Sequence, residues 1–329
     1  MHEDTELDGS EALSDAEDIE EALEPGGPVV LVVADRSDPG VGEVVRAIEQ
    51  NDDVRVHRFD PSAIGDGKAL VVGQIVGKLA RFWVGNDHGR TYLDEIRAVW
   101  WRPSARTSEG WRTLEALLAT CSNVFWIGSP SRVHALSSPP RNLIAAASAG
   151  LHTPLVEIHD HPGAALMELS SRWGVVRTLS WDGYPFGTGG GLDDVLASPA
   201  VVFQQGVRHA TYLVSAVYVD GQLFAARTEL PDSPLRFESE PARAPRPTEA
   251  FFDIPEPVRA SVTRFCETFM GGTFTRLRYA LLHFLVDDHD KWWFDKIEPC
   301  GDFWPVEEAT KQPVSQAVAT LLATAKEWE

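Results

Sequence analysis

Short apolar runs and amphipathic stretches alternate over the first part of the chain. Val29–Asp35, with the sequence VVLVVAD, is a β-branched run typical of a buried parallel strand. An apolar stripe with helical spacing follows over residues 41–48, and a second strand is predicted over Val54–Asp60. Parallel neighbours need a crossover connection, so this order predicts a small doubly wound sheet. The turn DRSDPG lacks the GxGxxG spacing of a dinucleotide site.

Strand-like segments dominate from Leu155 onward. A strand is predicted over Trp173–Trp181, the turn VDGQ joins two apolar runs as a hairpin, and the strands RYALLHFLVDD and KWWFDKIEP flank the turn DDHD. Prolines that start and glycines that end apolar stripes indicate helices. The other predicted elements are a hairpin over ALVVGQIVG and LARFWVG, a strand at Ile96–Ser104, and helices at Trp111–Thr120, RNLIAAASAG, PEPVRASVTRFCETFMGG and QAVATLLATAKEW. The pattern therefore predicts a mixed α/β and α+β protein.

Acidic residues are concentrated at the N-terminus. The chain has a formal net charge of −20, and residues 1–27 hold eleven Asp and Glu but no Lys or Arg. Such a block repels itself, so an acidic disordered tail is predicted over 1–27. Nucleic acid is not an expected partner, because phosphate binding needs a basic face.

The composition also bears on the compartment. No apolar run approaches the roughly 20 residues that span a bilayer, and the N-terminus lacks the segments of a secretory signal. Cys121, Cys266 and Cys300 are far apart and form no CxxC pair. We therefore expect a cytoplasmic protein that has no membrane segment, disulfide framework or zinc site.

Five segments, in the correct order, resemble anchor motifs of the ATP-grasp ligases that modify ribosomally made peptides, the graspetide or microviridin-type maturases. They are DRSDP with RFDP, VWWRPS, RNLIAAASAGLHTP, FQQGV, and RYALLHFLVDDHDKWWFDKIEPCGDFW. The last segment lines up without gaps against a family pattern like RYGAIDFVVTPDGRYVFLEINPNGQW. The resemblance covers roughly Val29 to the C-terminus.

This resemblance implies an ATP-grasp fold. The expected units are an N-terminal pre-ATP-grasp α/β domain over 28–128, a central ATP-grasp subdomain over 129–205 and a C-terminal ATP-grasp subdomain over 206–329. It also implies ATP and Mg²⁺ as cofactors and a precursor (leader) peptide as partner. In the family, an Asp or Glu side chain is activated as an acyl-phosphate, which an amine or hydroxyl then attacks.

The family's metal-binding pattern is altered in this sequence. Its Asp falls at His283, the Glu of its ExN pair at Lys296, and the Asn at Glu298. Residues 296 and 298 share one face of a strand, so that face carries a cation where an acid is expected. Protonated Lys296 cannot ligate Mg²⁺, and Mg²⁺ prefers oxygen to imidazole. Eroded metal binding is the leading interpretation, with Glu298 as the remaining suitable ligand.

Two alternatives stay open for this metal site. A one-residue register slip would make Asp295 a possible ligand, although the IxPxG frame at Ile297, Pro299 and Gly301 argues against it. An unfamiliar metal could instead use His283, since imidazole suits softer transition metals.

The expected nucleotide contacts have changed as well. The family's first lysine falls near Pro139, an expected hairpin Arg falls near Ser215, and the second lysine becomes an Arg that can still bind phosphate. At the hinge strand the Gln matches, but the acid that follows it has become a second Gln. The nucleotide-binding candidates carried over from the resemblance are Arg177, Gln204, Gln205, Val207 and Arg236.

Two functions follow from these residues. The first is a catalytically impaired ligase homologue that binds a precursor peptide or acts as a partner subunit, with an active homologue or as a homodimer. The second is a working ligase or macrocyclase with rearranged ligands, which would use Arg177, Glu298 and Asp295.

Overall fold

The computed structural model describes most of the chain after the acidic segment. The described residues are 27–50, 53–64, 68–76, 79–87, 89–102, 109–121, 124–136, 138–173, 176–179, 201–230, 254–268 and 276–325. The tail predicted over 1–27 therefore lies outside them except for its last residue, and so does Arg236. For Arg177 the structure describes the backbone but not the side chain.

A parallel four-stranded sheet in the order β2-β1-β6-β7 forms the N-terminal unit. β1 (Val29–Ala34) lies between β2 (Arg55–Phe59) and β6 (Ile96–Arg102), and β6 also pairs with β7 (Phe125–Ile127). All six residues of β1 are buried, because a central strand with helices on both faces has no solvent side. The predicted doubly wound sheet is confirmed.

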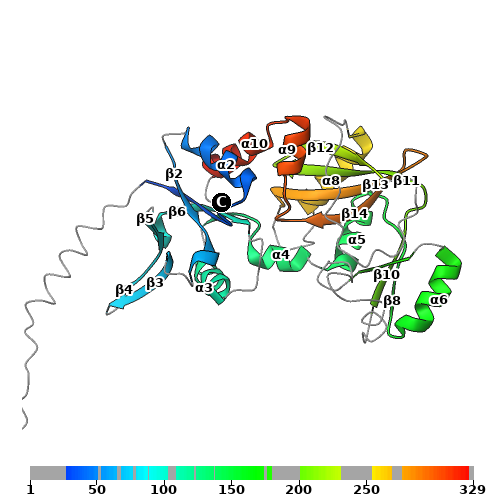
Figure 1. Cartoon of the computed structure of the whole chain (residues 1–329), viewed down its shortest axis with the longest axis horizontal. Helices are drawn as coiled ribbons and strands as arrows, with labels where there is room; N and C mark the ends of the chain where they lie inside the picture. Colours follow the sequence, from blue (N-terminus) through cyan, green and yellow to red (C-terminus); the bar gives the residue numbers. More distant parts are fainter. Residues whose placement is uncertain are drawn as a thin grey trace, which may run out of the picture.

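The two faces of this sheet are covered by different parts of the chain. α2 (Pro39–Glu49) and the C-terminal helix α10 (Val314–Thr324) pack on one face, and α3 (Glu109–Leu118) packs on the other. In Figure 1 the red helix α10 lies beside the blue helix α2, although they come from opposite ends of the chain. The C-terminus therefore completes the N-terminal core.

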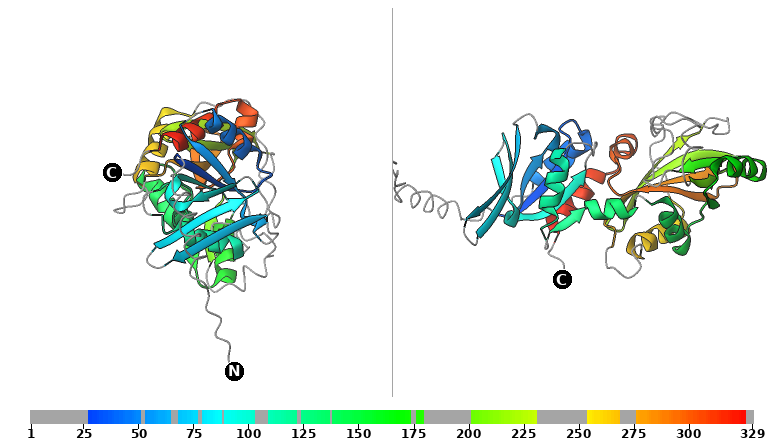
Figure 2. Two further views of the ribbon diagram at one scale, coloured as in Figure 1. Left: turned by 90° about the vertical axis from the view of Figure 1, so that its left-hand side faces the viewer. Right: turned by 90° about the horizontal axis from the view of Figure 1, so that it is seen from below.

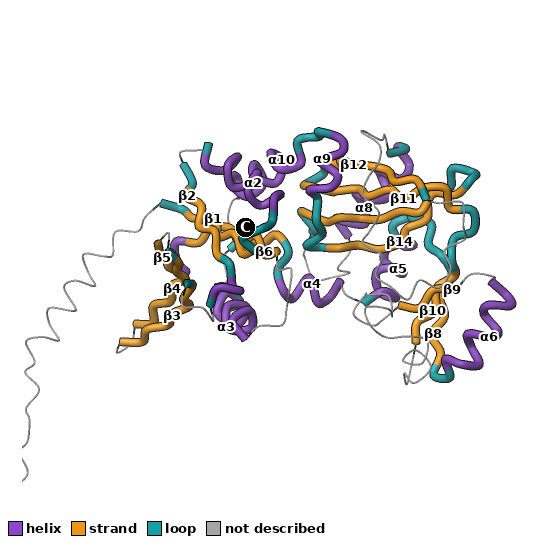
Figure 3. The backbone as a smooth tube through the Cα atoms, viewed as in Figure 1, coloured by secondary structure: helices purple, strands orange, loops and turns teal. Residues whose placement is uncertain are grey.

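A small antiparallel sheet lies on the outer side of the N-terminal unit (Figure 3). It consists of β3 (Ala69–Val76), β4 (Leu79–Asn86) and β5 (Gly89–Tyr92), and β3 and β4 form the predicted hairpin. Two 3-10 helices flank it in sequence, at Pro61–Ala63 and Leu93–Glu95.

The central unit is a three-stranded antiparallel sheet with one helix on it. β10 (Val201–Gln205) lies between β8 (Val156–His159) and β9 (Val176–Leu179), and α6 (Pro162–Trp173) packs on one face. The strand predicted from Trp173 was placed too early, because Trp173 is the last residue of α6. The buried residues Ala165, Leu169 and Trp173 recur every four positions, a helical signal that the strand interpretation overlooked.

The C-terminal unit is an antiparallel sheet in the order β12-β11-β13-β14. Its strands are β11 (Ala210–Val219), β12 (Gln222–Glu229), β13 (Tyr279–Asp287) and β14 (Trp292–Glu298). One face packs against α4 (Pro130–Leu136), α5 (Pro139–Ser148) and α8 (Glu256–Thr268). At one end, the other face packs against α9 (Trp304–Thr310) and α10. Figure 2 shows these units from two further sides.

None of the helices in the described ranges is long and apolar enough to cross a membrane.

Candidate functional site

A β-bulge in β14 decides which side chains share a face with the predicted metal-site positions. His283 of β13 pairs with Lys296, whereas the next pair on the ladder uses Phe294. Asp295 is therefore the extra residue of the bulge. Phe294 and Ile297 both point into the core, so Lys296 is placed on the opposite face. The register is the one that the resemblance implied, with Lys296 rather than Asp295 opposite His283.

Four polar side chains gather on this face of the sheet. Lys296 Nζ forms an ion pair with Glu298 Oε1, and His283 Nε2 lies 3.5 Å from the same oxygen. Ser215 of β11 contributes its Oγ, 3.3 Å from His283 Nδ1. His283 is buried, while the side chains of Lys296 and Glu298 remain 45% and 38% exposed. The sheet thus brings together the positions that the sequence singled out as altered.

The Glu298 carboxylate is held in its ionised form. Burial by itself would raise the pKa of Glu298, but the His283 ring and the Lys296 ammonium outweigh this effect and lower the pKa to about 2. Because His283 and Lys296 already interact with this carboxylate, its electrostatic attraction for an added metal ion is weaker.

The lowered pKa of Glu298 predicts an acid-dependent loss of stability. Ionised Glu298 is favoured in the folded chain, so its contribution is fully present above its ordinary pKa of 4.5 and is lost as the pH falls toward 2. In urea unfolding, Glu298→Gln should differ more from the wild type at pH 7 than at pH 3. An equal difference at both pH values would show that the ion pairs do not stabilise the fold.

The residues at this site do not fit Mg²⁺. Mg²⁺ requires several oxygen ligands in near-octahedral geometry, and this face provides one carboxylate and one hydroxyl beside an imidazole and an ammonium group. Within the described ranges, no group of three His, Cys, Asp or Glu side chains is arranged to hold a metal ion. Asp295 is half-buried at the bulge, displaced by one residue from the paired position.

The predicted hinge lies on β10. Phe203 packs against α6, so the alternating neighbour Gln204 points to the opposite face. Gln204 is 1% exposed, and neither of its side-chain amide atoms has a partner among the residues that the structure describes. Gln205 and Val207 are half-buried, and Arg177 is the Cα partner of Gln204 in the ladder.

One stretch of chain links the hinge to the altered metal positions. The carbonyl of His152 accepts a hydrogen bond from Phe294 N of β14 at 2.8 Å, and Leu155 O accepts one from Gln205 N at 2.8 Å. Three residues therefore separate the two attachment points, about 10 Å of extended chain. Pro139 begins α5 and has no charge to offer a phosphate, while Ser215 lies beside His283.

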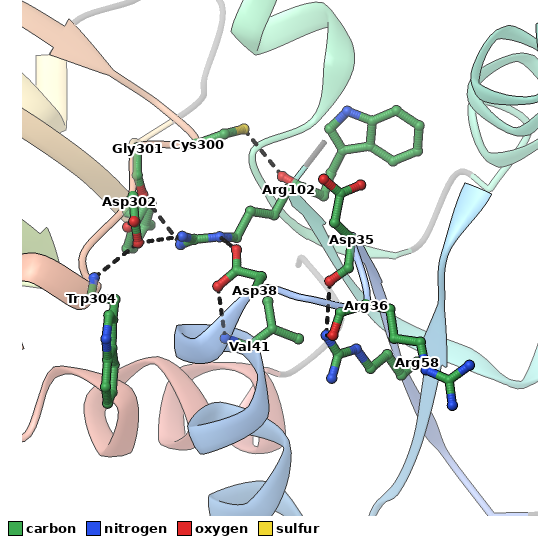
Figure 4. A network of polar contacts seen from close by, with 12 residues as sticks. Asp35, Arg36, Asp38, Val41, Arg58, Arg102, Cys300, Gly301, Asp302 and Trp304 are labelled. Atoms are coloured by element: carbon green, nitrogen blue, oxygen red, sulfur yellow. Dashed lines mark hydrogen bonds and ion pairs between the residues drawn. The ribbon is translucent and has the colours of Figure 1, made fainter. Parts of the chain in front are cut away.

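A second polar cluster, which the sequence did not indicate, joins the N-terminal unit to the loop after β14 (Figure 4). Arg102 at the end of β6 donates from Nε to Asp38 Oδ2 and from Nη2 to Asp302 Oδ1, both at 2.6 Å. Its Nη1 donates to Gly301 O at 3.3 Å, and the Tyr279 hydroxyl donates to the same carbonyl at 2.6 Å. Asp38, Arg102 and Asp302 each lie in one of the segments that resemble anchor motifs, but the sequence did not indicate that these three segments meet.

The charge of Arg102 is fixed by this environment. Its side chain is 6% exposed, and burial by itself would lower its pKa, but Tyr279, Asp38 and Asp302 raise it above the ordinary value. Burial also raises the pKa of Tyr279, so its hydroxyl stays protonated and remains a donor. The cluster therefore fixes the loop that follows Glu298 to the N-terminal sheet.

Solved structures of peptide-modifying ligases are similar to this chain. Macrocyclase MdnC bound with precursor peptide MdnA, from Microcystis aeruginosa MRC, is 18% identical with a TM-score of 0.70, over 90% of this chain and 100% of that chain. A Chryseobacterium gregarium RiPP-associated ATP-grasp ligase, in complex with ADP and a leader and core peptide, is 16% identical with a TM-score of 0.72, over 91% and 98%. The ATP-grasp ligase PsnB, complexed with minimal precursor, Mg and ADP, is 15% identical with a TM-score of 0.63, over 89% and 96%.

Sequence comparison adds no further match. No protein-family model matches the chain, and no curated protein is significantly similar to it. The structural matches nevertheless extend over almost the whole of each ligase and about nine tenths of this chain. Together with the sheet orders described above, they show that this chain has the ATP-grasp fold of the ligases associated with ribosomally made peptides.

Proposed function

We propose that this chain is an ATP-grasp-fold protein of ribosomal-peptide modification that binds a precursor peptide and has lost most of its ligase activity. The observation that carries the proposal is the ion pair between Lys296 and Glu298, with His283 beside the same carboxylate oxygen. An internal cation stands where a ligase of this fold needs acidic metal ligands. The chain would then act as a peptide-binding or partner subunit, beside an active homologue or a second copy.

The chemistry of these three residues supports impaired ligation. Ligation through an acyl-phosphate requires positive charge that bridges phosphate oxygens while they are transferred. Mg²⁺ would supply that charge in such enzymes by accepting several oxygen ligands at once. Lys296 carries a single positive charge on a flexible side chain, and its ammonium group already forms an ion pair with Glu298. The residues can therefore attract an anion without orienting it for transfer.

Peptide binding is supported by the similar structures. MdnC was solved bound with precursor peptide MdnA, and PsnB was solved with a minimal precursor. The likeness to these structures extends over about nine tenths of this chain. A fold retained beside altered ligands favours binding over catalysis, although fold alone does not define function.

The proposal is tested with short peptides encoded beside the gene of this chain. Binding of each peptide to the chain is measured by fluorescence anisotropy. Each peptide is then incubated with the chain, ATP and Mg²⁺, and its mass is measured by mass spectrometry. We expect binding of one of these peptides and no loss of water from it, with PsnB and its minimal precursor as the positive control. If none of the peptides binds, the peptide-binding role is wrong.

The same assay separates the second function from the first. Loss of water together with release of ADP would show a working ligase with rearranged ligands, which would use Arg177, Glu298 and Asp295. In that case Glu298→Gln should abolish the loss of water, since Glu298 is the carboxylate of this face that remains able to hold the metal.

A further inference from the structure

The small sheet of β3, β4 and β5 has two faces of different character. Ala69, Val84 and Thr91 are buried on the inner face, which packs against the core of the N-terminal unit. Side chains alternate along a strand, so Trp83 and Tyr92 lie on the opposite, outer face. The left view of Figure 2 shows this sheet in front, with no described helix covering it. The outer face therefore presents two half-buried aromatic side chains that none of the hydrophobic cores in the described ranges includes.

A glycine lets the Trp83 ring lie across this outer face. Val72, Trp83 and Tyr92 are directly opposite one another on the three strands. A Cβ added at Gly85 would lie 2.6 Å from the Trp83 ring, so a larger residue there would displace the ring. Arg90, the ladder partner of Gly85, places its guanidinium 5.6 Å from the centre of the same ring. The face is thus an aromatic surface with an exposed cation on it, a composition typical of binding hot spots.

The acidic N-terminal segment, residues 1–26, joins the described structure beside this face. The carbonyl of Gly27 accepts a hydrogen bond from Arg55 Nη2 at 3.0 Å, and the same nitrogen donates to Glu95 Oε1 at 3.1 Å. The other carboxylate oxygen of Glu95 accepts a hydrogen bond from Tyr92 N at 2.9 Å. Two side chains therefore connect Gly27 to the end of β5. A chain of this length extends over at most about 85 Å, so the whole outer face is within its reach.

The composition of this segment complements the outer face. Residues 1–26 hold eleven Asp and Glu but no Lys or Arg. Exposed cations border the aromatic row at Arg90 and at Lys68, which directly precedes β3. Two exposed acids nearby, Asp87 and Asp94, lie beyond the two ends of β5 rather than within the row. Carboxylates of the segment can therefore pair with the cations while its leucine side chains cover the aromatic rings.

We propose that the outer face of the β3–β5 sheet binds the acidic N-terminal segment of the same chain. The carboxylates of the segment pair with Arg90 and Lys68, and its leucine side chains cover Trp83. Because the segment is tethered at Gly27, its effective concentration at this face is about millimolar, so individually weak contacts suffice. The segment closes the face to other acidic peptides and to further copies of the chain. This inference does not depend on the proposed function.

The test is carbodiimide cross-linking of the full chain, which joins a lysine amine to a carboxylate in contact with it, with loss of water. The acidic segment contains no lysine, so each of its links to a lysine identifies a place that the segment contacts. We expect mass spectrometry to find these links several-fold more often at Lys68 than at Lys311, an exposed lysine after α9 and the matched control. At about 1 M salt, where the Debye length is about 3 Å, this excess should fall at least twofold.

Two variants separate binding at this face from simple reach. Arg90→Glu should lower the yield of links at Lys68 several-fold, because it replaces an attracting charge with a repelling one. Arg46→Glu reverses a charge at a 67% exposed position on α2 and should leave the yield unchanged. Trp83→Ser should lower the yield as well, and urea unfolding of this variant checks that the sheet still forms.

Equal yields at Lys68 and Lys311 would overturn the inference, and so would a yield at Lys68 that Arg90→Glu leaves unchanged. A mixture of isotopically light and heavy chains shows which molecule supplies the segment. Links within one label support binding in the same chain, whereas links that join the two labels at Lys68 would assign the face to a second copy and disprove the proposal. Neither peptide nor nucleotide is added, so failure here leaves the proposed function untouched.

Discussion

Replacing Arg102 with Met is expected to lower the free energy of unfolding by about 3 kcal/mol, because it removes one partner of a buried ion pair. The Asp38 carboxylate, 17% exposed, would keep its charge but lose the guanidinium that pairs with it. Gly301 O would lose one of its donors, although Tyr279 would still hold it. Met preserves much of the apolar stem, so the loss comes from charge and hydrogen bonding rather than from a cavity.

The measurement is urea unfolding of the full chain at pH 7, and the control is Arg46→Met. Arg46 pairs with Glu43 on the surface of α2, and its side chain is 67% exposed. An exposed pair of this spacing contributes about 0.5 kcal/mol or less. Losses of equal size in the two variants would mean that the Arg102 cluster does not fasten the loop to the N-terminal sheet.

Gly301→Ala is expected to lower the free energy of unfolding by about 2 kcal/mol, within the range for overpacking a filled core. A Cβ at this position would lie 2.5 Å from Leu281 Cβ and 3.0 Å from Glu298 Cβ. Leu281 Cβ is fixed to the backbone of a buried strand and cannot turn aside, so the loop itself would have to move. Movement there would displace Glu298.

The matched control for this substitution is Gly42→Ala in α2. A Cβ at residue 42 meets nothing within 4 Å, and alanine is favoured over glycine in a helix by about 1 kcal/mol. We therefore expect opposite signs, with Gly42→Ala slightly stabilising and Gly301→Ala destabilising in the same urea titration. A neutral Gly301→Ala would show that the loop adapts at little cost.

The Arg102 and Gly301 substitutions both act on the loop after β14, where it contacts the N-terminal sheet. Arg102 and Tyr279 hold the carbonyl of Gly301, and Gly301 follows three residues after Glu298. The N-terminal sheet is thus coupled to the face that carries Lys296, through polar contacts and through α10.

The sequence by itself determined the order of the elements and the fold class. The apolar run of β1, the hairpin of β3 and β4, and the segment from β13 to β14 each follow from periodicity within a few residues, which is where hydrophobic pattern is informative. The motif resemblance placed His283, Lys296 and Glu298 at corresponding positions because it ran without gaps. The helix α6 was also readable in its spacing, although the strand interpretation missed it.

Only the tertiary structure decided how those residues meet. The bulge at Asp295 sets which face Lys296 occupies, and a bulge depends on the partner strand rather than on local pattern. The Arg102 contacts join residues 64 and 200 positions apart, so no short window contains them. The burial of the Gln204 amide likewise appears only once β10 has packed into its sheet. The sequence gives the type of each side chain, but burial and side-chain contacts arise only when distant segments pack together.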